Sequence, residues 1–508
     1  GDIVVTQTIH IVDGTILKIP GVGSNPTING GGTSRIFTVV NASLHLDKVM
    51  VENGKAVTGG AIAASSSILT LNHTVFFGNI AFIYGGAIEV SRGSSIFSRE
   101  SAFFSNTAGS GGAVYMTDAS SASWTGDTTF SNNVAERSGA LHVGDRSSVS
   151  WTGVTRFFGN VASAIGGALE VKDSSSASWS GTMSFKNNSA GGFAGAVHVS
   201  DEGSISWNGS TQFSNNSALR AAGGALVVTR NSDVSWSGLA TFSDNSAQAG
   251  GGGLLVYNSS SVSWSRGTIF SNNKATEADG GAIMAIASTV SWSGETMFLA
   301  NNAAAEGGAI YAFESSVTWS TDTTFSHNAA DEGGAILLTG GSRVEWIGKT
   351  TFSFNSASSD GGAIEFKLAD SVTPSALVIN VTTNFTNNTC GANGGGIAMQ
   401  GMSTVEFETV RITFIANSAE VSGGAIFISG SSFGPVVKNI AFIGNTAQVG
   451  GGVYVTGSGT ASDGDIRHPT TFQGCSFVDN IADISGGAVN SELGQDIFFN
   501  SSFIGNRA

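Results

Sequence analysis

Two histidines and one glutamate recur at a single interval along this chain. His142, Glu170 and His198 are each 28 residues apart, and Glu89 and Tyr115 precede them at similar spacing. Imidazole nitrogens and carboxylate oxygens are ligands that Zn²⁺ and Cu²⁺ accept in proteins. If the interval is one turn of stacked strands, these side chains lie about 4.8 Å apart on adjacent strands and point outward. The row is therefore a candidate Zn²⁺ or Cu²⁺ site, and the alternative interpretation is a solvated row of polar side chains.

Hydroxyl side chains form a second periodic set. Ser148 and Ser150 recur 28 residues later as Ser176 and Ser178, and similar pairs continue until Arg343 interrupts them. Residues two apart on a strand share one face, so these pairs predict a flat face that carries hydroxyl groups. Ice binding and O-glycosylation are both hypotheses for such a face, although ice binding would favour threonine over serine.

Asparagines in the pattern Asn-x-Ser/Thr are candidate sites for N-glycosylation. They are Asn41, Asn72, Asn187, Asn208, Asn215, Asn258, Asn380, Asn384, Asn387 and Asn500. Asn187, Asn215 and Asn387 stand directly before the asparagine of a repeated motif, a position that is expected to face solvent. This density of sites is compatible with a secreted eukaryotic glycoprotein.

All the tryptophans occupy one phase of a repeat. Successive tryptophans are separated by 27–29 residues. They are Trp124, Trp151, Trp179, Trp207, Trp236, Trp264, Trp292, Trp319 and Trp346. A valine two residues earlier, as at Val149 and Val234, shares a strand face with the ring, which predicts that the rings stack in the core. The alternative is an outward row of rings that binds sugars.

Two further motifs keep step with the tryptophans. One is Gly-Gly-Ala followed by an aliphatic residue, as at 85–88, and the other is Phe-x-x-Asn, as at Phe157 and Asn160. Each occurs sixteen times when close variants are included. Glycine suits corners that need a positive φ or a close backbone approach, and asparagine tolerates the left-handed conformation. Apolar and polar residues alternate between these motifs, as in 147–153, which predicts strands rather than helices.

These periods predict an all-β fold, a single-stranded right-handed parallel β-helix of about 16–18 coils of about 27 residues. Each coil is expected to hold about three short strands. Residues 1–58 are predicted to form opening coils, residues 59–370 the regular tryptophan-containing repeats, and residues 371–508 less regular coils with longer loops. The three segments are expected to form one continuous solenoid.

Longer loops are expected at 367–375, 430–435 and 457–469, where the spacing of the motifs widens. The chain stops in mid-coil, and an open coil end is an unpaired strand edge. We therefore expect either that the natural chain continues or that copies stack end to end. The first residues do not form a signal peptide, so any secretion signal was removed or lies outside this sequence.

Charge, hydrophobicity and cysteine content argue against nucleic-acid binding, a membrane span and a disulfide framework. The formal net charge is −15, so binding to nucleic acid is not expected. The sequence has no run of 18 apolar residues, so no membrane span is expected in this segment. Cys390 and Cys475 are too few for a disulfide framework, and about three coils separate them, so they are expected to stay unpaired with each other.

The paired glycine and Phe-x-x-Asn motifs resemble those of the chlamydial polymorphic outer membrane proteins and of related adhesin-like repeat proteins in algae and other protists. The resemblance covers roughly residues 55–508. It implies a secreted or surface-displayed β-helix of the pectin-lyase-like type, often acting in adhesion. The sequence departs from the family because no translocator domain follows the repeats, and because Ser-x-Trp-Ser-Gly is not part of the short bacterial motif.

Pectin-active β-helices use clustered Asp, Lys and Arg, often with Ca²⁺, whereas the cationic residues here are few and scattered. The sequence therefore predicts no catalytic residue and no cofactor. The expected function is that of a rigid extracellular rod on a cell surface or in a fibre or wall layer, with glycans or matrix proteins as partners. The alternatives are an adhesin with a carbohydrate or receptor site in its longer loops, a polysaccharide lyase or hydrolase, and an ice-binding protein.

Overall fold

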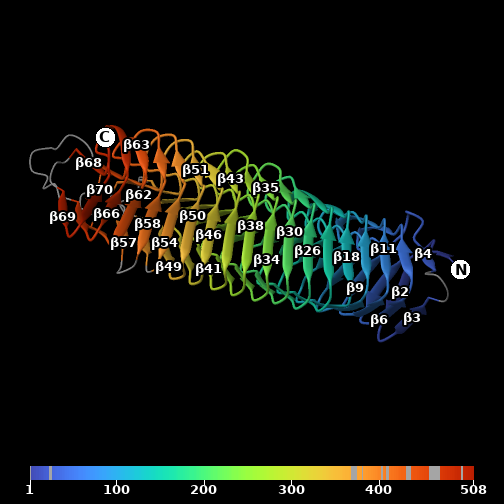
Figure 1. Cartoon of the computed structure of the whole chain (residues 1–508). Helices are drawn as coiled ribbons and strands as arrows, with labels where there is room; N and C mark the ends of the chain where they lie inside the picture. The colour runs from blue at the N-terminus through green and yellow to red at the C-terminus, as the bar shows by residue number, and fades with distance from the viewer. Residues whose placement is uncertain are drawn as a thin grey trace, which may run out of the picture. The chain divides into compact units, whose positions relative to one another are not determined.

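The computed structural model describes residues 2–21, 26–367, 375–379, 381–401, 404–407, 411–430, 436–456, 470–492 and 496–508. Every regular element in these ranges is a β-strand, and neighbouring coils pair in parallel (Figure 1). The chain forms a right-handed β-solenoid of about 16 turns of about 28 residues. The predicted fold class is confirmed, while the long loops predicted at 367–375, 430–435 and 457–469 fall largely outside the described residues.

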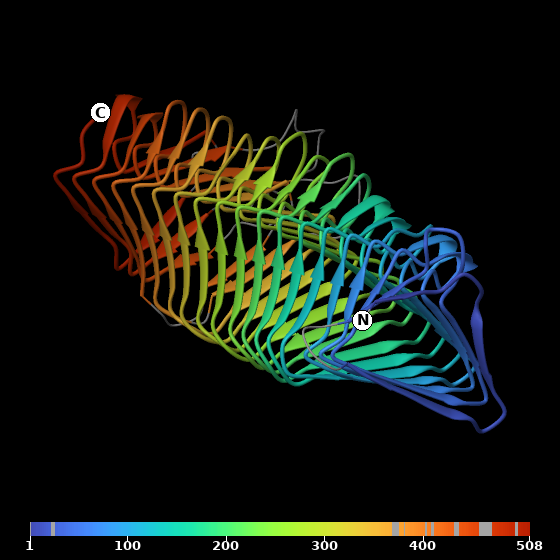
Figure 2. The same ribbon diagram turned by 90° about the vertical axis from the view of Figure 1, so that its right-hand side faces the viewer.

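The chain divides into two compact units. Unit 1 comprises Gly1–Gln248 with Gly253–Val262, and unit 2 comprises Ala249–Gly252 with Ser263–Ala508. Both units are built from the same repeating coil, in which successive turns lie one behind another around a closed interior (Figure 2).

One coil of unit 1 illustrates the repeat. It contains β20 (Leu141–Val143), β21 (Ser148–Trp151), β22 (Thr155–Phe158) and β23 (Val161–Ile165). The first three follow the glycine pair, carry the tryptophan and lead into Phe-x-x-Asn, as predicted. The fourth strand was not predicted, because it is often only two residues long and its sequence carries no alternation. It gives hydrogen-bond partners to backbone groups between the asparagine and the next glycine pair.

The glycine pair forms a corner for two separate reasons. Gly166 has φ +67°, a left-handed conformation that side chains disfavour. A Cβ atom on Gly167 would lie 1.9 Å from the carbonyl oxygen of Gly195 in the next coil, so only glycine allows this approach. The two glycines therefore set the direction of the chain and the spacing of the coils at this corner.

Stacked asparagines stabilise the corner that follows the phenylalanine. In Asn160, Oδ1 accepts hydrogen bonds from the backbone N–H and Nδ2 of Asn133, both at 3.0 Å. Its Nδ2 donates to the carbonyl oxygen of Phe130 and to Oδ1 of Asn188, again at 3.0 Å. Because these asparagines are fully buried, the ladder satisfies polar groups that water cannot reach.

The core contains the predicted aromatic columns. All nine tryptophans are at most 2% exposed. Trp151 and Trp179 stack with ring centroids 4.3 Å apart, and Trp207 packs edge-on against Phe213 at 5.9 Å. The rings therefore lie in the interior, as predicted from the valines that stand two residues before them on the same strand face.

Candidate functional site

The predicted polar row lies on the outer side of one sheet of unit 1. The sheet includes β16 (Val114–Met116), β20, β24 (Leu169–Val171) and β28 (Val197–Val199). The strand register pairs Tyr115 with His142, His142 with Glu170, and Glu170 with His198. Their strand neighbours face the core, so the row has the predicted spacing and the predicted side of the sheet.

The row is not solvated, which corrects the expectation of an exposed line of side chains. His142 is 6% exposed, His198 is 7% exposed, and Glu170 is not exposed at all. The end of the fourth strand and the corner position after it lie against the outer face of this sheet: Arg137 ends β19 (Val134–Arg137), and Ser138 follows it. Ser138, in that segment, lies with its Oγ 3.2 Å from Nδ1 of His142 and donates to Oε2 of Glu170 at 2.8 Å.

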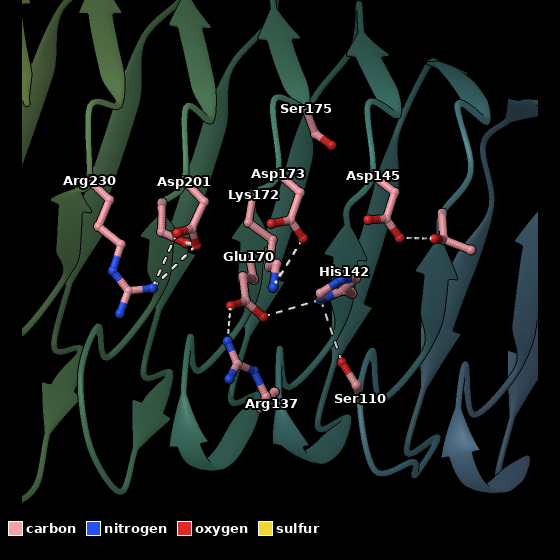
Figure 3. Close-up of polar contacts among 12 residues, drawn as sticks. Ser110, Arg137, His142, Asp145, Glu170, Lys172, Asp173, Ser175, Asp201 and Arg230 are labelled. Carbon is pink, nitrogen blue, oxygen red and sulfur yellow. Dashed lines mark hydrogen bonds and ion pairs between the residues drawn. The ribbon is translucent and has the colours of Figure 1, made fainter.

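Glu170 is the centre of a hydrogen-bonded cluster (Figure 3). Its Oε1 lies 2.6 Å from Nη2 of Arg137 and 3.3 Å from Nδ1 of His198, and its Oε2 lies 3.1 Å from Nδ1 of His142. Burial alone would raise the pKa of Glu170, but hydrogen bonds and electrostatic interactions with His142 and His198 hold that pKa well below its usual value. The carboxylate is therefore ionised and fully partnered.

This geometry bears on the metal hypothesis. Among the residues that the structure describes, no group of three or more His, Cys, Asp or Glu side chains is placed to hold a metal ion. In the cluster, Nδ1 of each imidazole approaches the carboxylate rather than a common point between ligands. The arrangement that is present is an ion-pair and hydrogen-bond network, and the ring of Tyr115 stacks on His142 at 4.5 Å.

A polar groove lies beside this cluster, at the corner between the outer-row strands and the tryptophan strands of unit 1. It has a cavity volume of about 630 Å³ and opens to solvent. Five acidic and two basic side chains line it with one serine and one asparagine. The lining residues are Asp118, Asp145, Arg146, Asp173, Ser174, Asp201, Glu202, Arg230 and Asn231.

A repeated turn presents the side chains of the groove. At this corner two consecutive residues adopt positive φ, for example Asp145 (51°) and Arg146 (62°). Aspartate and asparagine tolerate this conformation better than most residues. The same turn recurs at 118–119, 173–174, 201–202 and 230–231, so the polar side chains of these neighbouring coils stand in parallel rows. Sequence reasoning missed the groove, although paired polar residues at this one phase of the repeat were a usable signal.

Few of the carboxylates in the groove have a cationic partner. Arg230 lies 3.2 Å from Oδ1 of Asp201, and Lys172 lies 3.1 Å from Oδ2 of Asp173 (Figure 3). Burial tends to raise the pKa of Asp201, but hydrogen bonds from Ser200 and Arg230 lower it below its usual value. The groove therefore presents excess negative charge, with hydrogen-bond acceptors at regular spacing.

The other predicted sites are distributed over the surface. Six of the sequon asparagines are exposed: Asn41, Asn187, Asn208, Asn215, Asn258 and Asn500. Asn72, Asn384 and Asn387 are half-buried, and Asn380 lies outside the described residues. The hydroxyl columns are in register, since Ser148 pairs with Ser176 and Ser150 with Ser178.

Neither cysteine offers a reactive site in unit 2. Cys390 and Cys475 are free thiols, and both are buried. Burial raises the pKa of the Cys390 thiol to about 12, so it is protonated at neutral pH. A buried, protonated thiol is a poor nucleophile.

The fold and its periodic sites define a β-helix repeat protein. Residues 267–286 and 411–429 match the Chlamydia polymorphic membrane protein repeat, and each matched segment contains one Phe-x-x-Asn and one glycine motif. The chain is thus similar to the polymorphic membrane proteins in both repeat sequence and fold, as the motifs predicted. A search of curated proteins found no match, and neither did a search of solved structures. In the described part of the chain, no helix has the length and hydrophobicity to cross a membrane.

Proposed function

We propose that this protein is an extracellular, adhesin-like structural β-helix displayed at a cell surface. The observation that carries the proposal is the match to the polymorphic membrane protein repeat on a chain that is β-solenoid in all its described parts. Stacked asparagine and aromatic columns stabilise such a fold. Because the core holds the coil together, its outward-facing residues can vary without loss of the fold. This property suits a protein that binds other cells or molecules through its surface.

A second candidate function is supported by the groove of unit 1. We propose it as the binding site of an adhesin for a carbohydrate or for a receptor that carries cationic groups. Carboxylates bind sugar hydroxyls and ammonium or guanidinium groups through charge-assisted hydrogen bonds. The groove differs from the site expected from sequence, which was placed in the longer loops at 367–375, 430–435 and 457–469.

The test is binding of the purified protein to a glycan array and to cultured cells. Asp145→Asn combined with Asp173→Asn removes two charges from the groove and is expected to weaken binding at least tenfold. Asp127→Asn is the matched control, because Asp127 is an exposed carboxylate of the same unit outside the groove. Equal loss in both variants would contradict a role for the groove.

The same preparation tests the remaining alternatives. Chain cleavage of pectin or another polysaccharide by the wild-type protein would place it among the enzymes. Thermal hysteresis would support ice binding by the hydroxyl face. If neither appears and no cell or glycan is bound, the adhesive function is wrong and a purely structural function in a wall layer or fibre is favoured.

Glycosylation is proposed at the exposed sequons. Asn187 and Asn215 lie at equivalent corner positions in consecutive coils and are both exposed. Secretion from eukaryotic cells is expected to add mass that an N-glycosidase removes. Asn187→Gln should lose one such glycan, whereas no change in mass would exclude N-glycosylation at that residue.

A further inference from the structure

Unit 2 contains a second buried glutamate at the coil position of Glu170. Glu365 lies in β52 (Ile364–Phe366), four residues after the corner glycine Gly361, as Glu170 lies four residues after Gly166. The register pairs Glu365 with Leu337 of one neighbouring coil and Ala398 of the other. Like Glu170, it is not exposed at all.

The hydrogen bonds of Glu365 differ from those of Glu170. Nε2 of Gln400 donates to Oε1 of Glu365 at 3.2 Å. Its Oε2 is buried and has no hydrogen-bond partner among the described residues. The carboxylate of Glu170, in contrast, lies within hydrogen-bond distance of one arginine, one serine and two histidines. An ionised carboxylate in the place of Glu365 would thus be desolvated without compensating donors.

The charged groups that face Glu365 are mostly of the same sign. Glu306 and Glu332 approach from the corner segments of two preceding coils, Asp360 from the corner of its own coil, and Lys367 from the end of its own strand. The ammonium group of Lys367 is already committed, since its Nζ lies 2.6 Å from Oε1 of Glu306 and also contacts Oε2 of Glu332.

Asp360 is also held by neutral donors. Its Oδ1 accepts from the backbone N–H of Asn393 at 2.8 Å, and its Oδ2 accepts from Nε2 of Gln400 at 3.1 Å. Gln400 therefore links the carboxyl groups of Asp360 and Glu365 through one nitrogen. If Glu365 were ionised, its negative charge would lie next to the carboxylate of Asp360, and the amide of Gln400 would be the donor that the two groups share.

Burial, followed by the charges of Glu332 and Asp360, raises the pKa of Glu365 to about 9, and Lys367 offsets only part of this rise. Burial also raises the pKa of Asp360. The geometry and the direction of these shifts agree, because each favours a proton on Glu365 at neutral pH.

We propose that Glu365 is a proton-dependent latch of unit 2: its neutral carboxyl group lets the corner segment 360–362 and Gln400 close over the outer face of β52. Loss of the proton places a third carboxylate beside Glu332 and Asp360 and opens this corner. The carboxyl group of Glu365 binds a proton more tightly when the corner is closed than when it is open, so closure is fully favoured below the ordinary glutamate pKa. It weakens by up to tenfold per pH unit between that value and about 9.

The test is hydrogen exchange of the β52 amides, measured from pH 6 to pH 9 on the full chain. Glu365→Gln keeps the shape of the side chain and cannot ionise. The exchange rate of the wild type, divided by that of this variant, cancels the chemical pH dependence and is expected to rise toward tenfold per pH unit. Glu170→Gln is the matched control in unit 1 and should leave the slope for β52 unchanged. A flat ratio would overturn the proposal.

A second measurement keeps the proposal testable if Glu365→Gln does not fold. The wild-type infrared difference spectrum between pH 7 and pH 10 should lose a carboxylic-acid C=O band and gain a carboxylate band while the β-sheet signal persists. Absence of a protonated carboxyl band at pH 7 would show that Glu365 is ionised and would overturn the latch.

Discussion

The asparagine ladder permits a quantitative test of what stabilises the coil. Asn160→Ala removes the side chain that accepts from Asn133 and donates to Phe130. The buried backbone N–H of Asn133 and the carbonyl oxygen of Phe130 each lose a side-chain partner. Leaving a buried polar group unsatisfied costs about 1–3 kcal/mol, so the two together are expected to cost about 4 kcal/mol.

Native-state hydrogen exchange is the suitable assay, because the chain has two compact units and a single unfolding free energy is not defined for it. In a solenoid each coil packs on its neighbours, so the effect should be local. About 4 kcal/mol corresponds to roughly a thousandfold faster exchange. This increase is expected in β18 (Thr128–Ser131) and β22, with little change in unit 2.

Asn132→Gly provides the matched control for this experiment. Asn132 is adjacent to the ladder, is exposed, and has φ 54°, which glycine adopts readily. Replacing Asn132 is expected to change the amide hydrogen-exchange rates of these strands by less than about threefold. If Asn160→Ala accelerates exchange by less than tenfold, or if the control has an equal effect, the ladder does not stabilise the coil as argued.

Three further predictions use contrasts within the chain. Thr350 accepts a hydrogen bond from the indole of Trp319 at 3.1 Å, whereas the hydroxyl of Thr155 has no hydrogen-bond partner in the described part of the chain. Thr350→Val should therefore cost about 1–3 kcal/mol and Thr155→Val about none, as measured by local hydrogen exchange. Gly167→Ala should destabilise its coil by about 3 kcal/mol or more, since the added Cβ meets a carbonyl oxygen; normal thermal stability would contradict this. Because the pKa of Glu170 is lowered on folding, its stabilisation is present above the ordinary glutamate value and is lost as the pH falls through the folded value; Glu170→Gln should remove this acid dependence from unit 1.

Much of the fold could be predicted from the sequence because one repeat determines both period and side-chain direction. The spacing of Trp151 and Trp179 predicted stacked strands, and parity with Val149 placed the rings inside. The corner glycines were also predictable, since close backbone approach and positive φ both require them. These features depend on local geometry that every coil repeats.

Coverage of a strand face could not be predicted in the same way. Alternation indicated that His142 and Glu170 lie on the outer side of their sheet, but it does not reveal whether another segment covers that side. The covering residues are Arg137, at the end of β19, and Ser138, which takes the place of the first corner glycine, and neither residue type recurs at its position in the neighbouring coils. For the same reason the groove went unnoticed, because its side chains meet only after the coils are stacked.

The single-residue corner before each ladder asparagine has a consequence for how such chains diversify. Asn187, Asp244, His327 and Phe354 occupy this corner in different coils, with φ of 55°, 56°, 57° and 55°. One backbone conformation thus accommodates an amide, an acid, an imidazole and an aromatic ring without altering the strands on either side. Mutation at these places can change what another molecule encounters while the distance between successive positions stays constant, so new specificities can arise without a new fold.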